Sequence, residues 1–136
     1  MNKPRPTWNE YFGQFAELAA TRSPYKTKVG CVIVSPDNRI VSTGYNGFFA
    51  GAIHYPMIQD GHEVATVHAE ANAISYAARC GMETKDCSIY ITHFPCLDCF
   101  KLIVSAGIKK IYYKEEYNVN SIINELKDSY VEIIKL

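Results

Sequence analysis

The chain has 136 residues, of which 48% are hydrophobic and 21% charged, enough apolar material for one compact domain and too much for a disordered chain. Fourteen basic residues balance fourteen acidic ones, so the strong positive field that supports nucleic-acid binding is missing. No apolar run has the length of a membrane span, and the first residues lack a secretory signal. We therefore expect a single domain over 1–136, cytoplasmic, with a small-molecule partner, no nucleic acid and no membrane.

The first half predicts a helix, a hairpin and a long loop. Apolar residues at helical spacing follow Thr7, a suitable N-cap, and stop before Pro24. Two β-rich runs at 29–34 and 40–45 are joined by turn-forming residues, which predicts antiparallel strands. The stretch 46–66 has no clear period, and a structureless connection of that length is usually functional. We interpret it as a loop of the site.

In the second half, helical and extended patterns alternate. This alternation predicts a parallel βαβαβ unit after the hairpin, and hence a mixed sheet of five strands. The expected helices are 67–79, 96–105 and 120–126, and the expected strands are 88–92, 109–113 and 130–134.

Five cysteines lack the regular spacing of a disulfide framework. Cys31, Cys80 and Cys87 lie in or beside apolar segments, where reduced cysteine usually serves as a small hydrophobe. Cys96 and Cys99 form a C-x-x-C pair, which indicates metal or redox chemistry in a reducing compartment.

Two further motifs begin predicted helices: His-Ala-Glu in one and Pro-Cys-Leu-Asp-Cys in the next. In a unit of this kind, the N-termini of adjacent helices lie side by side at the C-terminal edge of the sheet. His68, Cys96 and Cys99 can then converge, and one nitrogen with two thiolates suits Zn²⁺ with a fourth position left for water. Glu70 projects differently from His68 and is placed to carry protons to and from that water.

Together these motifs carry a family resemblance. His-x-Glu followed by Pro-Cys-x-x-Cys is the signature of the zinc-dependent deaminases, and the chain resembles the deoxycytidylate deaminases most, phage enzymes included. The resemblance implies a cytidine-deaminase-like α/β/α sandwich with a five-stranded mixed sheet. It also implies a Zn²⁺ cofactor and hydrolysis of dCMP to dUMP and ammonia, which feeds thymidylate synthesis. The segments that carry it are 29–34, 44–47, 68–74, 94–99 and 101–108.

The same resemblance implies roles for individual residues. His68, Cys96 and Cys99 match the zinc ligands, and Glu70 matches the general acid and base, which moves protons to N3 and to the departing amine. The residues implied in substrate binding are Asn46 for the sugar or base, Ala69 and the backbone from Thr92 to Phe94 for the pyrimidine edge, Phe94 also as a wall for the ring, Tyr117 for the phosphate, and Arg22 and Lys28 for an anion.

Regulation is implied as well. Relatives bind an allosteric nucleotide at a matching segment, and they form homo-hexamers that dCTP activates and dTTP inhibits. The segment 23–28 departs from the family pattern, so effector contacts there can differ. The matching allosteric residues in this chain are Gly44, Tyr45, Asn46 and Gly47.

A second, structural zinc is not expected, because 46–66 contains His54 and His62 but no cysteine. Both histidines, and His93, are expected to be solvated or hydrogen-bonded. Two alternatives stay open. A tRNA adenosine deaminase shares the ligands, although zero net charge argues against a polyanionic substrate. A zinc-stabilised binding module without catalysis is the other, although it has no use for Glu70.

Overall fold

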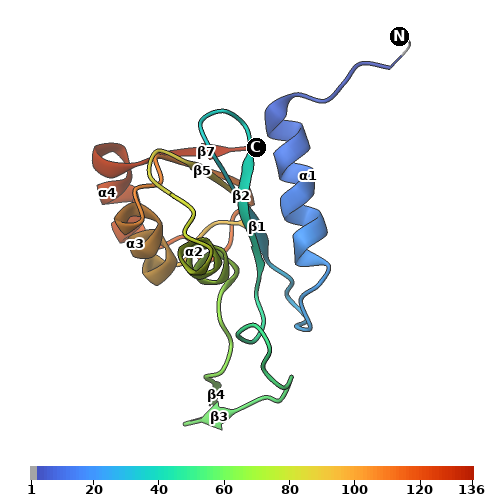
Figure 1. Ribbon diagram of the computed structural model, residues 1–136. Coiled ribbons are helices and arrows are strands. Elements are labelled where there is room, and N and C mark those ends of the chain that lie inside the picture. Colours follow the sequence, from blue (N-terminus) through green and yellow to red (C-terminus); the bar gives the residue numbers. More distant parts are fainter. Residues whose placement is uncertain (1–2) are drawn as a thin grey trace.

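The computed structural model describes residues 3–136. A five-stranded sheet in the order β2-β1-β5-β6-β7 is the middle layer, with α1 on one face and α2, α3 and α4 on the other (Figure 1). No helix in the described range is long and apolar enough to cross a bilayer. The elements are α1 (Trp8–Ala20), β1 (Gly30–Val34), β2 (Ile40–Tyr45), β3 (Ile58–Gln59), β4 (His62–Glu63), α2 (Ala69–Arg79), β5 (Ser88–His93), α3 (Leu97–Ser105), β6 (Lys110–Glu115), α4 (Ser121–Tyr130) and β7 (Glu132–Lys135).

The sheet combines both strand directions. β1 pairs antiparallel with β2 and with β5, whereas β5, β6 and β7 run parallel. Parallel neighbours need crossover connections, and α3 and α4 supply them. The predicted mixed sheet, with a hairpin followed by a parallel βαβαβ unit, is confirmed.

The predicted start of α1 is also confirmed. The Thr7 hydroxyl accepts a hydrogen bond from the Glu10 backbone N–H, and the Glu10 carboxylate accepts one from the Thr7 backbone N–H, both at 3.1 Å. This reciprocal capping box satisfies two backbone donors that a helix otherwise leaves without partners.

Two predictions were wrong in detail. The 46–66 stretch is not structureless, because β3 and β4 form a short hairpin whose turn residues Asp60 and Gly61 both have positive φ, 51° and 77°. An Asp-Gly pair is a strong hairpin signal, and it was available in the sequence. In the C-terminal part, α4 continues to Tyr130 instead of ending at 126, and β7 begins at Glu132. Tyr130, expected in the strand, therefore ends the helix.

The core lies on both faces of the sheet. β1 is the central antiparallel strand and is buried along its whole length. Its alternate residues separate by face: Val32 joins the smaller cluster under α1, with Phe12, and Ile33 joins the larger cluster under the other helices, with Ile103 and Ile123. This period of two is what a strand between two helical layers requires.

Gly44 allows α2 to approach β2 very closely. A Cβ atom at this position would lie 2.2 Å from the carbonyl oxygen of Ala69 and 2.9 Å from the backbone nitrogen of Ala73. Both atoms belong to the helix backbone, which cannot move aside as a side chain can. The first turn of α2 therefore rests directly on the sheet, and its position depends on the missing side chain.

We expect Gly44→Ala to lower the free energy of unfolding by about 2 kcal/mol or more, because overpacking against backbone forces the helix away. Gly13→Ala is the matched control, since its Cβ would meet only the Leu136 side chain, at 3.3 Å. Alanine stabilises a helix interior relative to glycine, so that variant should match or exceed the wild type. Urea denaturation measures both, and equal losses in the two variants would contradict this account of Gly44.

Candidate active site

Two helix N-termini bring the predicted metal ligands together. His68 is the N-cap residue of α2, Cys96 is the N-cap residue of α3, and Cys99 lies in the first turn of α3. The Nδ1 atom of His68 lies 3.5 Å from Sγ of Cys96 and 3.4 Å from Sγ of Cys99. Within residues 3–136, this is the group of histidine, cysteine and carboxylate side chains that could hold a metal ion.

The spacing of these atoms fits zinc. Tetrahedral Zn²⁺ with Zn–S and Zn–N bonds of about 2.3 and 2.05 Å places a nitrogen and a sulfur ligand about 3.6 Å apart. The two nitrogen-to-sulfur distances of 3.5 and 3.4 Å are close to this value. Three ligands of N, S and S character occupy three corners of the tetrahedron and leave the fourth for a water molecule.

The electrostatics of the cluster favour a cation. Hydrogen bonding, first with Cys99 and then with His68, lowers the pKa of the Cys96 thiol to about 4. The Cys96 sulfur also accepts a hydrogen bond from the backbone N–H of Cys99 at 3.4 Å. The hydrogen bond to Cys96, supported by burial, raises the pKa of Cys99. Negative charge therefore concentrates on Cys96 at a helix N-terminus, where thiolates are stabilised.

Glu70 is a buried carboxyl group beside this cluster. It lies in the first turn of α2 with 4% of its surface exposed. Burial raises its pKa, because removal from water disfavours the charged form. A carboxyl group with a raised pKa is suited to take up a proton and release it again near neutral pH.

A cavity of about 210 Å³ joins the cluster to Glu70. The predicted substrate residues Asn46, Ala69, Phe94 and Tyr117 line it, as does His93, whose side chain was expected only to be solvated or hydrogen-bonded. We call this cavity the active-site pocket. Its lining residues are Thr27, Val29, Asn46, Thr66, His68, Ala69, Glu70, His93, Phe94, Cys96 and Tyr117.

Three predicted substrate residues lie outside this lining. Arg22 is exposed, and the Lys28 ammonium donates a hydrogen bond to the backbone carbonyl of Ser23. Thr92 is buried behind the pocket, where its hydroxyl oxygen accepts a hydrogen bond from the Gly30 N–H at 3.1 Å. The backbone N–H of Phe94 is already donated to the carbonyl of Glu115, at 2.8 Å. It is therefore engaged within the fold.

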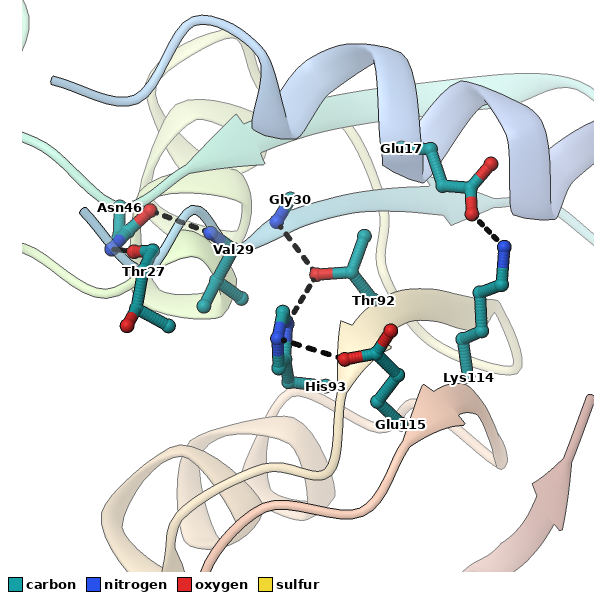
Figure 2. Close-up of polar contacts among 9 residues, drawn as sticks. All are labelled: Glu17, Thr27, Val29, Gly30, Asn46, Thr92, His93, Lys114 and Glu115. Carbon is teal, nitrogen blue, oxygen red and sulfur yellow. Dashed lines mark hydrogen bonds and ion pairs between the residues drawn. The ribbon is translucent and has the colours of Figure 1, made fainter. Parts of the chain in front are cut away.

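Asn46 holds one wall of the pocket in place. Its Oδ1 atom accepts a hydrogen bond from the Val29 backbone N–H at 2.8 Å, and its Nδ2 group donates one to the Thr27 carbonyl at 2.9 Å (Figure 2). The next residue, Gly47, exchanges two backbone hydrogen bonds with Val67. Before it, the Tyr45 carbonyl accepts a hydrogen bond from Asn72 at 2.9 Å. The 44–47 segment thus has a clear structural role, and its allosteric role stays a prediction.

The family model for the cytidine and deoxycytidylate deaminase zinc-binding region matches residues 6–115. The chain belongs to this deaminase family. Zinc is the metal of the family's binding region, and His68, Cys96 and Cys99 are the residues whose geometry fits it.

Individual known proteins resemble the chain over most of its length. ComE operon protein 2 of Bacillus subtilis is 41% identical over 90% of this chain and 67% of its own length. The deoxycytidylate deaminase of Mycobacterium phage D29 is 39% identical over 82% of this chain and 98% of its own. The crystal structure of the dCMP deaminase from cyanophage S-TIM5, in complex with dCMP and dUMP, superposes with a TM-score of 0.84 at 33% identity and covers 98% of this chain and 100% of that chain.

We expect Cys99→Ala to lose zinc, because two protein ligands hold the ion far less well than three. The wild type should retain about one zinc per chain after dialysis, whereas the variant should retain only a small fraction. Cys87→Ala is the matched control, since Cys87 is a buried free cysteine outside the ligand cluster. Zinc content is measured by atomic absorption, and a fully metallated Cys99→Ala protein would refute the ligand assignment.

Proposed function

We propose that this deaminase converts dCMP and water to dUMP and ammonia. The observation that carries the proposal is the buried Glu70 carboxyl group, which shares one pocket with His68 and Cys96, two members of the His68, Cys96 and Cys99 cluster. A deoxycytidylate deaminase from a phage and a cyanophage dCMP deaminase bound to dCMP and dUMP are similar to this chain over most of its length. The product would supply thymidylate synthesis, and the single domain formed by 1–136 would act in the cytoplasm.

The chemistry divides between the metal and the carboxyl group. Zinc, when bound by His68, Cys96 and Cys99, lowers the pKa of a coordinated water molecule to about 7. Glu70 takes up the proton released as the water attacks C4 of the base and delivers it to N3. Glu70 would then take the second proton from the new hydroxyl group on C4 and pass it to the amine, so that the C4–N bond breaks, ammonia leaves and a carbonyl group remains at C4. These transfers need a group that is a good acid and a good base at one pH, and the raised pKa of Glu70 supplies that property.

The walls of the pocket hold the base during these transfers. Phe94 is buried at the pocket wall, and its ring packs edge-on against Tyr113 with centroids 5.0 Å apart. A rigid apolar wall excludes water and lowers the local dielectric constant, which strengthens interactions with developing charge. Asn46, fixed by its backbone contacts, would face the sugar or the base.

We expect Glu70→Gln to retain about one zinc per chain while deamination falls by at least ~10²-fold, because the amide cannot shuttle protons. Glu125→Gln is the control, since Glu125 lies exposed on α4 and its loss changes the net charge equally. Zinc content and ammonia release measure the two effects. Near-normal turnover in Glu70→Gln would contradict the mechanism.

The substrate itself is identified by ammonia release from dCMP, dCTP, CMP, deoxycytidine and cytosine. dCMP should have the highest kcat/KM. A tRNA adenosine deaminase would instead release ammonia from adenosine in tRNA, and a non-catalytic zinc module would release none from any substrate. Either result would overturn the proposed reaction.

Regulation by nucleotides belongs to the same proposal. A hollow of about 140 Å³ lies beside the 44–47 segment, with Phe48 and the exposed ring of Tyr76 in its lining. It would bind dCTP as activator and dTTP as inhibitor. Exposed apolar side chains on three helices, Tyr76, Leu102 and Ile122, support association of copies into a homo-hexamer, through which effector and substrate sites would be coupled.

We expect the rate to depend sigmoidally on dCMP concentration without effectors and hyperbolically with added dCTP. Added dTTP should weaken the saturation by dCMP. Each response reflects a coupling free energy of about 1–3 kcal/mol. Steady-state kinetics at several effector concentrations measure the coupling, calorimetry counts bound dCTP, and light scattering gives the number of subunits. Hyperbolic kinetics that ignore both nucleotides would show that this chain lacks the regulation.

A further inference from the structure

The active-site pocket has few groups that could bind a phosphate. Among its lining residues within 3–136 there is no lysine or arginine, and the two basic side chains are His68 and His93. His68 belongs to the metal ligands. A nucleotide bound with its base at Glu70 therefore meets one remaining basic side chain, that of His93.

The neighbours of His93 favour the tautomer with the proton on Nε2, because the Glu115 carboxylate beside Nε2 only accepts a hydrogen bond, whereas the Thr92 hydroxyl beside Nδ1 can donate one. The Thr92 hydroxyl oxygen accepts a hydrogen bond from the Gly30 N–H, and it lies 2.8 Å from Nδ1 of His93 (Figure 2). The hydroxyl proton is then free to be donated to Nδ1. A neutral imidazole that accepts at Nδ1 carries its proton on Nε2. Thr92 thus presents His93 as a donor through Nε2.

That donor lies beside two exposed side chains, those of Glu115 and Tyr117. Nε2 of His93 lies 3.5 Å from a carboxylate oxygen of Glu115, its register partner on the parallel strand β6 (Figure 2). The His93 ring packs edge-on against Tyr117 with centroids 5.9 Å apart, and Tyr117 is 51% exposed. A separation of 3.5 Å is too long for a strong hydrogen bond, so an incoming oxygen can replace the carboxylate.

The orientation of the substrate follows from burial. The reacting edge of the base must reach Glu70, the buried end of the pocket, so the charged end of the nucleotide lies at the exposed end, beside His93 and Tyr117. Three lysines of the neighbouring segments have partners elsewhere: Lys114 is paired with Glu17, Lys135 with Glu116, and the Lys28 ammonium donates a hydrogen bond to the Ser23 carbonyl. Glu115, whose side chain is 66% exposed, adds negative charge 3.5 Å from the Nε2 donor.

We propose that His93 and Glu115 together select nucleoside monophosphates over nucleoside di- and triphosphates. This inference rests on the proposed function and deepens it. His93 donates its Nε2–H to the one phosphate group that reaches the mouth. Each further phosphate extends outward with additional negative charge past the Glu115 carboxylate, where no lining lysine or arginine compensates it.

The donor is tested by His93→Phe and His93→Gln. Phenylalanine keeps the ring against Tyr117 but removes the donor, so kcat/KM for dCMP should fall at least ~10-fold, the effect of losing a hydrogen bond to a charged group. The kcat/KM for deoxycytidine, which has no phosphate, should stay within about twofold. Glutamine, whose amide keeps a donor near the Nε2 position, should lie closer to the wild type for dCMP. Equal losses with dCMP and deoxycytidine would overturn the role of His93.

The selection is tested by Glu115→Gln. This variant should raise kcat/KM for dCDP and dCTP relative to dCMP at least ~3-fold, an effect that salt weakens. Glu125→Gln removes a carboxylate on α4 and should leave the ratio unchanged. No gain with Glu115→Gln, or an equal gain with Glu125→Gln, would overturn the selection.

Ligand-binding measurements distinguish a failure of this inference from a failure of the proposed reaction. Calorimetry with zinc-loaded protein compares the product dUMP with deoxyuridine, and His93→Phe should weaken only dUMP, again at least ~10-fold. If the wild type released no ammonia from dCMP, the proposed function would fail. If the wild type were active but the variants left the phosphate dependence unchanged, only the inference would fail.

Discussion

The site depends on the contact between the first turn of α2 and the sheet. Three side chains of the sheet and helix reinforce it with hydrogen bonds to backbone carbonyls: the Cys31 thiol donates to Ala69, the Ser42 hydroxyl to Ala73 and the Asn72 amide to Tyr45. Gly44 permits the close approach because a Cβ atom would collide with the helix backbone. His68 and Glu70 flank Ala69, so the position of one ligand and of the proton carrier is set by packing in the core.

The second half of the site depends on the parallel strands. β5 and β6 run in the same direction, so α3 must begin at the edge of the sheet where β5 ends. Cys96 and Cys99 occupy that helix start, and Phe94, between strand and helix, donates its backbone N–H to β6. Metal ligands placed on two rigid helix starts need little reorganisation when an ion binds, as a preorganised site requires.

The sequence predicted the residues whose chemistry shows in their type and spacing. The cluster of His68, Cys96 and Cys99 belongs to this class, because few other functions demand one nitrogen and two sulfurs at two helix starts. The backbone of His93 was expected at the pyrimidine edge, but its side chain was missed, since one histidine at a strand end carries no spacing signal. Its position depends on the register with Glu115 across β5 and β6, which is a tertiary feature.

Arg22 and Lys28 precede β1 and lie outside the pocket lining, so their contact with an anion stays a prediction. The misplaced end of one helix has a physical cause. The end of α4 was misplaced because its last turn is polar. The length of α4 is set by tertiary contacts, because its residue Ile123 is buried in the core and Val131, directly after the helix, is buried too. Helix propensity is a weak guide where such packing decides the boundary.

The charges in the pocket finally constrain how a nucleotide can be bound. A bound divalent ion would balance two thiolates at Cys96 and Cys99, which would leave Glu70 as the acidic group of the pocket lining. A dianionic phosphate therefore gains little from long-range attraction, and its binding must rest on short, directed hydrogen bonds. Such bonds are lost when a group is displaced by an ångström, whereas attraction between separated charges is not. A pocket of this kind distinguishes nucleotides by where the phosphate lies, and that position is set by the rigid wall that Asn46 and Thr92 hold in place.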